Sequence, residues 1–243
     1  MTRFPHALFA SAVVLAAPAL ASDYAQLAGL HKEWRAFQAG PMTAQGVPDF
    51  TAAANQSRAD GLKQFQARLA ALDIAGWSIA QKVDYNLVRA EMNGLDFDLR
   101  VAKPWQRDPA WYVSVWDSQA DTPAHEGPVH PLPVDLWTYR FPLDAAQSAK
   151  LTGELAHIPG LLSQARGNLT GNARDLWKAS RRNIQGQVAA LTALAAKVPA
   201  GDRKLQAAIA AARTATIDYL AWVDAQAPTK TGPSGVGKEA YSW

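Results

Sequence analysis

The feature that most constrains the fold is a helical spacing of large apolar residues, which recurs along most of the chain. Residues 23–38 place Leu27, Leu30, Trp34 and Phe37 three or four positions apart. Because an α-helix completes a turn in about 3.6 residues, this spacing puts the four side chains on one helical face. A Gly-Pro pair follows and marks the end of this predicted helix.

The same spacing predicts two further helices in the first hundred residues. One runs over residues 49–72. The next begins at Ser78 and extends to about residue 101, because Ser78 and Gln81 have the spacing of a capping box. The residues of this third helix that we expect to face inward are Val83, Leu87, Met92 and Leu95.

The C-terminal half shows the same helical pattern. Helices are predicted over 144–158, 172–198 and 202–225, and Pro159 fits the first turn of another helix, where its missing N–H costs nothing. Residues 110–116 form the sole stretch with some character of a strand. We therefore predict an all-α fold, a bundle-like array of antiparallel helices.

A long irregular insertion, residues 103–142, interrupts the helices. It is rich in proline and contains four tryptophans: Trp105, Trp111, Trp116 and Trp137. Exposed tryptophans can stack on sugars, but tryptophans in a long loop more often anchor it by burying a large area. We expect anchoring, and a loop of this length is either a structural flap or part of a site.

The first 21 residues have the organisation of a secretory signal peptide. Arg3 supplies a positive charge, an apolar run covers residues 7–20, and small residues precede the expected cleavage point after Ala21. The run is shorter than the roughly 20 apolar residues of a membrane-spanning helix and contains Pro18. We expect a periplasmic or secreted mature protein with no membrane span.

Charge and cysteine content exclude several classes of function. The chain has 24 Lys and Arg against 21 Asp and Glu, giving a net charge of +3, and no basic run of the kind that binds nucleic acid. It has no cysteine. A thiol nucleophile, cysteine-bound zinc and the lipid-modified cysteine of a bacterial lipoprotein are therefore excluded in this sequence.

A histidine pair in the insertion has the wrong spacing for a zinc peptidase. His125 and His130 are five residues apart, with Gly127 and Pro128 between them. A zinc peptidase helix needs histidines four residues apart, because that spacing places both imidazoles on one face. We therefore assign no metal ligand here.

Other candidate clusters also fail to form a site. Glu91, Asp96 and Asp98 do not share one helical face, so we expect them to be solvated. The Gly235–Lys238 segment lacks the spacing of a phosphate-binding loop. The sequence predicts no catalytic, cofactor-binding or metal-binding residue in this chain.

Three segments resemble successive parts of a bacterial family called domain of unknown function 885: residues 69–99, 155–169 and 232–243. The resemblance implies a mainly helical, exported or lipid-anchored protein that is longer than this chain and similar to zincin metallopeptidases. In the family, a His-Glu-x-x-His helix lies downstream of the segment that matches residues 237–241. The resemblance therefore implies zinc and a peptide substrate for a full-length relative, with no metal ligand in this chain.

On this basis we expect residues 22–227 to be the helical N-terminal region of the family. Residues 228–243 would form a linker and the start of a catalytic-like half that this sequence lacks, with Glu239 and Tyr241 nearest to it. The chain alone would be inactive and would expose an apolar face through which it associates. The alternative is a stand-alone periplasmic binding or scaffold protein that uses the Trp-rich loop as its contact surface.

Overall fold

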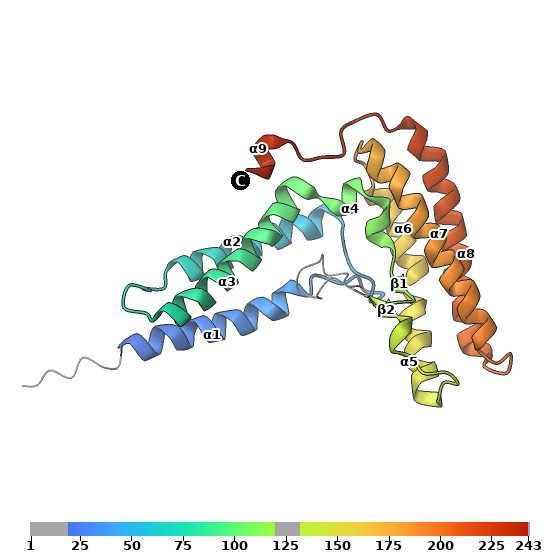
Figure 1. Cartoon of the computed structure of the whole chain (residues 1–243), viewed down its shortest axis with the longest axis horizontal. Helices are drawn as coiled ribbons and strands as arrows, with labels where there is room; N and C mark the ends of the chain where they lie inside the picture. The colour runs from blue at the N-terminus through green and yellow to red at the C-terminus, as the bar shows by residue number, and fades with distance from the viewer. Residues whose placement is uncertain (1–18, 120–131, 243) are drawn as a thin grey trace, which may run out of the picture.

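A computed structural model describes residues 19–119 and 132–242. The fold is all-α, as the apolar spacing predicts, apart from one sheet of two very short strands. Two helical bodies diverge from a junction around the short helix α4, Pro104–Arg107, as Figure 1 shows. In the described part of the chain, no helix is long and apolar enough to cross a membrane.

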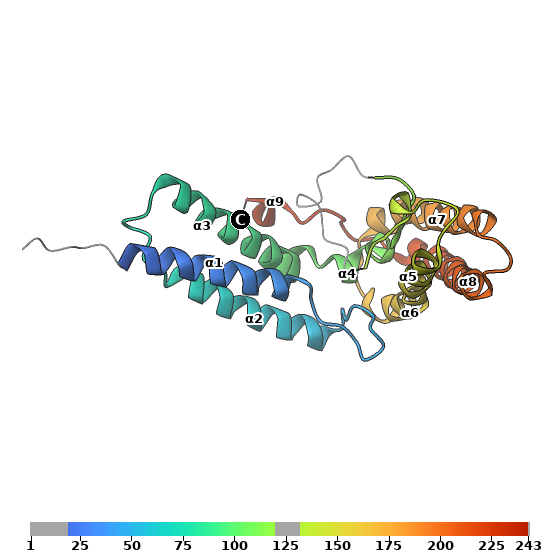
Figure 2. The same cartoon turned by 90° about the horizontal axis from the view of Figure 1, so that it is seen from below.

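The N-terminal body consists of three antiparallel helices (Figure 2): α1, Ala19–Gln38, α2, Ala52–Ala70, and α3, Ile79–Phe97. Thr51 caps α2 by accepting a hydrogen bond from the amide of Ala54. Ser78 and Gln81 form the predicted capping box at α3. The core of this body includes Leu27, Leu30, Trp34, Leu62, Leu69, Val88 and Met92.

The inward face predicted for α3 is partly wrong. Met92 is fully buried and Leu95 is half-buried, but Val83 is 50% exposed and Leu87 is 60% exposed. Val88 is buried instead of Leu87. The apolar residues of α3 therefore cover two faces, and only one of them meets α1 and α2.

The insertion is less irregular than its sequence indicates. A π-helical turn, η1 (Asp98–Ala102), leads into it, and it contains α4 and the 3-10 turns η2 (Pro109–Tyr112) and η3 (Leu136–Thr138). Strands β1, Val115–Trp116, and β2, Val134–Asp135, pair in parallel, with Val115 opposite Val134. Burial of Trp105, Tyr112 and Val134 explains this order, because these residues join the hydrophobic core.

The C-terminal body contains α5 (Ala145–Ala156), α6 (Ile158–Asn168), α7 (Arg174–Lys197) and α8 (Arg203–Gln226). The 3-10 turn η4, Ala227–Thr229, and the short helix α9, Lys238–Tyr241, follow. Pro159 lies in the first turn of α6, as predicted. The predicted and observed ends of the long helices agree to within a few residues, because caps and apolar spacing are local signals.

One buried glutamine joins the insertion to the C-terminal body. The Oε1 atom of Gln187, on α7, accepts hydrogen bonds from the amides of Ser114 at 2.7 Å and Val115 at 3.0 Å. Its Nε2 atom donates to Thr216 Oγ1 on α8 at 3.0 Å. All these partners are buried, so Gln187 satisfies polar groups that water cannot reach.

Residues 230–235, which we call the strap, make several hydrogen bonds to neighbouring elements. The amide of Thr231 donates to Asn172 Oδ1 at 2.7 Å, and the amide of Arg174 donates to the carbonyl of Gly232 at 3.1 Å. Ser234 Oγ accepts from the amide of Asp175 at 2.7 Å. Arg107 Nη2 donates to the carbonyl of Ser234 at 2.7 Å. The strap therefore joins α4 to the start of α7.

A single added methyl group should displace the strap. A Cβ atom at Gly232 would lie 2.2 Å from the carbonyl oxygen of Asn172, whereas a Cβ atom at Gly235 would meet nothing within 4 Å. We expect Gly232→Ala to lower the free energy of unfolding by about 1–3 kcal/mol because of this overpacking. Gly235→Ala should change it by less than about 0.5 kcal/mol. Urea unfolding of both variants tests this, and equal effects would contradict it.

Candidate functional site: an apolar stripe and an arginine pocket

The motif residues from the sequence lie partly outside the described residues. His125 and His130 lie outside the described residues, so their role stays a prediction. Within the described residues, no group of three or more His, Asp or Glu side chains could hold a metal ion.

The three carboxylates of α3 and its extension have separate environments. Glu91 accepts hydrogen bonds from Trp34 Nε1 at 2.9 Å and from Gln38 at 3.2 Å. Asp96 forms an ion pair with Arg100 at 2.7 Å. Asp98 is half-buried rather than solvated, and burial raises its pKa. The three carboxylates thus have different partners.

The four tryptophans of the insertion divide into two kinds. Trp105 is buried, and Trp111 is half-buried with its ring packed edge-on against Phe50. These two anchor the insertion, as expected. Trp116 and Trp137 are 42% and 43% exposed, so they remain free to contact a partner.

An apolar stripe runs along the outer face of α3. It consists of Ile79, Val83 and Leu87, one turn apart, with exposed fractions of 85%, 50% and 60%. We call these three residues the α3 stripe. Large apolar side chains that line up on an exposed helical face are typical of a surface that contacts another protein segment.

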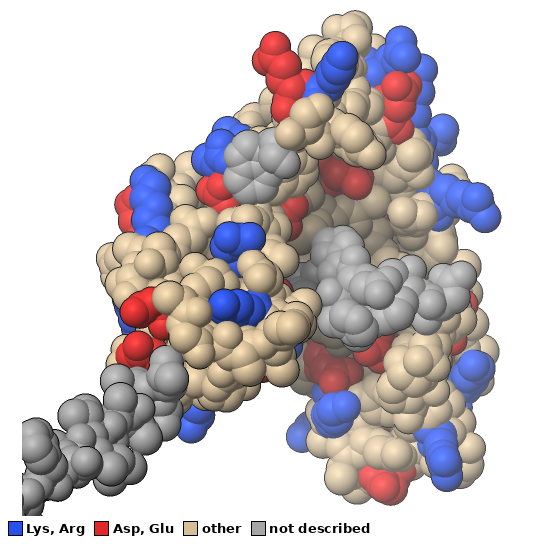
Figure 3. All heavy atoms as spheres, turned by 60° about the vertical axis from the view of Figure 1, so that its left-hand side comes forward, with Lys and Arg blue, Asp and Glu red and all other residues tan. Residues whose placement is uncertain are grey.

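One face of the molecule is mixed in charge. Figure 3 shows Lys and Arg interspersed with Asp and Glu on this face, and a hollow between the two bodies. No single sign of charge gathers there, so this face has no strong field to attract a polyanion.

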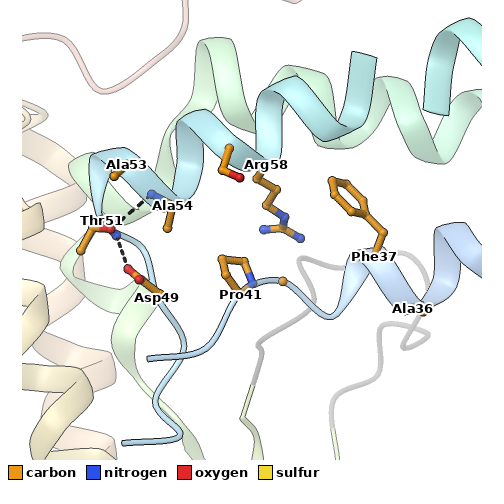
Figure 4. Close-up of a pocket in the computed structure, with 10 residues that line it drawn as sticks. Ala36, Phe37, Pro41, Asp49, Thr51, Ala53, Ala54 and Arg58 are labelled. Carbon is orange, nitrogen blue, oxygen red and sulfur yellow. Dashed lines mark hydrogen bonds between the residues drawn. The ribbon is translucent and has the colours of Figure 1, made fainter. Parts of the chain in front are cut away.

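A pocket of about 480 Å³ lies between the end of α1, the loop that follows it and the start of α2. Figure 4 shows Arg58 and Asp49 in this pocket, with Ala54 and Pro41 between them. Phe37 forms its other apolar wall. We call it the Arg58 pocket.

The Arg58 guanidinium is only partly paired. Its Nη2 atom donates to the carbonyl of Gln38 at 2.9 Å, at the end of α1. Its Nε atom is buried and has no acceptor among the described residues. Burial lowers the pKa of Arg58, and the nearby charge of Asp98 opposes this lowering. Arg58 therefore keeps hydrogen-bonding capacity that no described side chain uses.

Comparison with known proteins identifies the family. Residues 34–243 match the model of "Bacterial protein of unknown function (DUF885)". The chain belongs to the DUF885 family. The match covers all the helices of the chain except the first part of α1, and a search of curated proteins gives no match.

One solved structure, titled "The structure of a putative lipoprotein of unknown function from Shewanella oneidensis", is similar to this DUF885 chain. The TM-score is 0.61 at 18% sequence identity. The match covers 93% of this chain but 41% of that one, so this chain spans less than half of that protein's length. At this identity the likeness concerns the fold alone.

Sequence reasoning missed the Arg58 pocket and placed the α3 stripe incorrectly. The pocket combines the end of α1, a loop and α2, and no motif marks it. The stripe could have been found from the sequence, because α3 carries more apolar positions than one helical face holds.

Proposed function

We propose that this DUF885 chain acts as the helical N-terminal part of a longer exported protein, where it supplies a contact surface rather than catalytic groups. The longer protein would be a zinc-dependent, peptidase-like enzyme, with its metal ligands and its site for a peptide substrate outside residues 1–243. The observation that carries the proposal is the match to the Shewanella protein, which includes nearly all of this chain but less than half of that one.

The described residues are consistent with a supporting role. They contain no metal-ligand cluster, so any metal chemistry would belong to another part of the protein. The α3 stripe offers apolar area that the rest of the protein would cover. In both ribbon views helix α9 lies near the last part of α3 (Figures 1 and 2), whereas the stripe is in the first half of α3.

Export is supported by two observations. The Shewanella protein is described as a lipoprotein, and the first 21 residues of this chain have the organisation of a signal peptide. This chain has no cysteine to carry a lipid. We therefore propose a periplasmic or secreted location after cleavage behind Ala21.

The first experiment is to read the nucleotide sequence beyond codon 243 in three frames and to measure the intact mass of the host protein. We expect a continuation that encodes a His-Glu-x-x-His helix with a further glutamate downstream. A stop codon after Trp243 together with a secreted mass equal to residues 22–243 would contradict the proposal.

The α3 stripe gives a second test on the purified chain. We expect Leu87→Lys to reduce the binding of an apolar fluorescent dye, because the substitution places a charge in the middle of the exposed apolar surface. The free energy of unfolding should change by less than about 0.5 kcal/mol, since Leu87 is exposed. Gln64→Lys on α2, also exposed, is the control and should leave dye binding unchanged. Equal dye binding by the unmodified chain and Leu87→Lys would contradict an exposed stripe.

The exposure of Trp116 and Trp137 favours one alternative, a stand-alone periplasmic binding or scaffold protein that uses the Trp-rich loop. In that case Trp116→Ala and Trp137→Ala would abolish partner capture, and Leu87→Lys would not. The N-terminal-part proposal instead expects Leu87→Lys, and not the tryptophan variants, to weaken the contact with the rest of the longer protein.

A further inference from the structure

The arginines of the N-terminal body differ sharply in how they are paired. Arg68 forms a two-bond ion pair with Glu33, with distances of 2.7 and 3.1 Å. Arg100 is paired with Asp96, and Arg35 lies 3.7 Å from Glu91. Arg58, by contrast, donates to a backbone carbonyl, that of Gln38.

The Nε atom of Arg58 is buried and has no acceptor among the described residues, and Nη2 has one, the carbonyl of Gln38. A buried N–H without an acceptor is costly, and the cost is larger when the donor carries charge. A guanidinium offers five N–H donors in a planar fork that matches the two oxygens of a carboxylate. Arg58 lines a pocket of about 480 Å³, which has room for a small organic molecule.

The opposite end of the pocket carries the opposite charge. Asp49 lines it, and one of its oxygens accepts the amide of Thr51 at 2.9 Å. A carboxylate has more acceptor sites than this one bond uses, so Asp49 can also accept from a cation. Between Asp49 and Arg58, the side chains of Pro41 and Ala54 provide an apolar middle (Figure 4).

We propose that the Arg58 pocket binds a small organic zwitterion, with the carboxylate of the ligand on Arg58, its apolar body against Pro41 and Ala54, and its cationic group at Asp49. A ligand with a carboxylate alone would meet repulsion from Asp49, and a ligand with a cation alone would leave Arg58 without an acceptor. This arrangement therefore selects for a molecule that carries both charges. The inference does not depend on the proposed function.

Within the described residues, the carboxylate of Asp98 is the group that could compete with the carboxylate of a ligand for Arg58. It is half-buried near Arg58, and its charge favours the charged form of the arginine. No ion pair within 4.0 Å joins the two residues, so Asp98 neutralises Arg58 only at a distance. The Nη1 and Nη2 donors of Arg58 are therefore left to hold the carboxylate of a ligand, since Nη2 has only the bond to Gln38.

The test uses three ligands of the same length, which differ only in their end groups. Backbone amide shifts of Gly40, Thr51 and Ala54 are followed by NMR while 6-aminohexanoate, hexanoate or hexylamine is added to the purified chain. We expect 6-aminohexanoate to bind with a Kd of about 1 mM, as is usual for so small a ligand. Hexanoate and hexylamine should each bind about tenfold more weakly, because each lacks one charge contact.

Two conservative variants test which residue binds the carboxylate of the ligand and which binds its cationic group. Arg58→Gln should make 6-aminohexanoate bind no better than hexylamine, and Asp49→Asn should make it bind no better than hexanoate, while the Asn oxygen can still accept the amide of Thr51. Arg68→Gln, on the same helix but outside the pocket, is the matched control and should leave all three affinities unchanged. Ala54→Leu should weaken all three ligands by filling the pocket, and it keeps Arg58 in case Arg58→Gln does not fold.

Three results would overturn the proposal. The first is that 6-aminohexanoate binds no more tightly than both single-charge ligands. The second is that folded Arg58→Gln or Ala54→Leu binds it as well as the unmodified chain. The third is that inorganic phosphate shifts the same amides with equal or higher affinity, which would make the pocket a general anion site.

Discussion

Replacement of Gln187 by leucine is expected to lower the free energy of unfolding by about 3 kcal/mol or more. Leucine has a similar volume but no acceptor, so the buried amides of Ser114 and Val115 would lose their partner. Each buried polar group left without a hydrogen bond costs about 1–3 kcal/mol. Thr216 would also lose the donor from Gln187 Nε2, although its own hydrogen bond to the carbonyl of Ala212 would remain.

Gln185→Leu is the matched control for this prediction. Gln185 lies two residues earlier on α7 and is exposed, so the same substitution there should change stability by less than about 0.5 kcal/mol. Urea unfolding followed by circular dichroism measures both variants. A Gln187→Leu protein as stable as Gln185→Leu would show that the junction between β1, α7 and α8 does not depend on this side chain.

Trp34→Ala is expected to destabilise the N-terminal body by about 3–5 kcal/mol, the range measured when large buried aromatic residues are removed. Trp34 is completely buried. Its ring lies 5.7 Å from both Phe37 and Phe65, and its Nε1 atom donates to Glu91 at 2.9 Å. The substitution would leave a cavity where α1, α2 and α3 meet.

Two further variants separate the contributions to this effect. Trp34→Phe keeps most of the packing and removes the hydrogen bond to Glu91, so it should cost clearly less than Trp34→Ala. Trp137→Ala removes an indole that is 43% exposed and should cost less than about 1 kcal/mol. Thermal unfolding monitored by circular dichroism compares them, and a Trp34→Ala protein no less stable than Trp137→Ala would contradict the assigned core.

Much of the fold could be predicted from the sequence because its signals are local. The apolar spacing of residues 23–38 predicted the part of α1 that packs against α2 and α3. The capping box of Ser78 and Gln81 marked the start of α3, as the structure confirms. The order within the insertion could not be predicted, since it depends on Tyr112 and Val134 packing against helices distant in sequence.

The candidate sites were harder to predict than the helices. Arg58 and Asp49 belong to no recognised motif, and they share a pocket because the loop after α1 returns to the start of α2. The sequence shows that Val83 and Leu87 are apolar, but it does not show that they are exposed. Burial depends on what packs against a helical face, and that information lies elsewhere in the chain.

The sequence by itself determined the all-α class, the main helix boundaries and the absence of a cysteine-based site. It did so because helical period, capping and composition act over a few neighbouring residues. The tertiary structure decided which apolar face of α3 stays exposed, how the strap is held and where Arg58 lacks a partner. These features depend on contacts between segments far apart in the chain, such as Gln187 with Ser114 and Arg107 with Ser234. A pattern of neighbouring residues does not show which distant residues will meet.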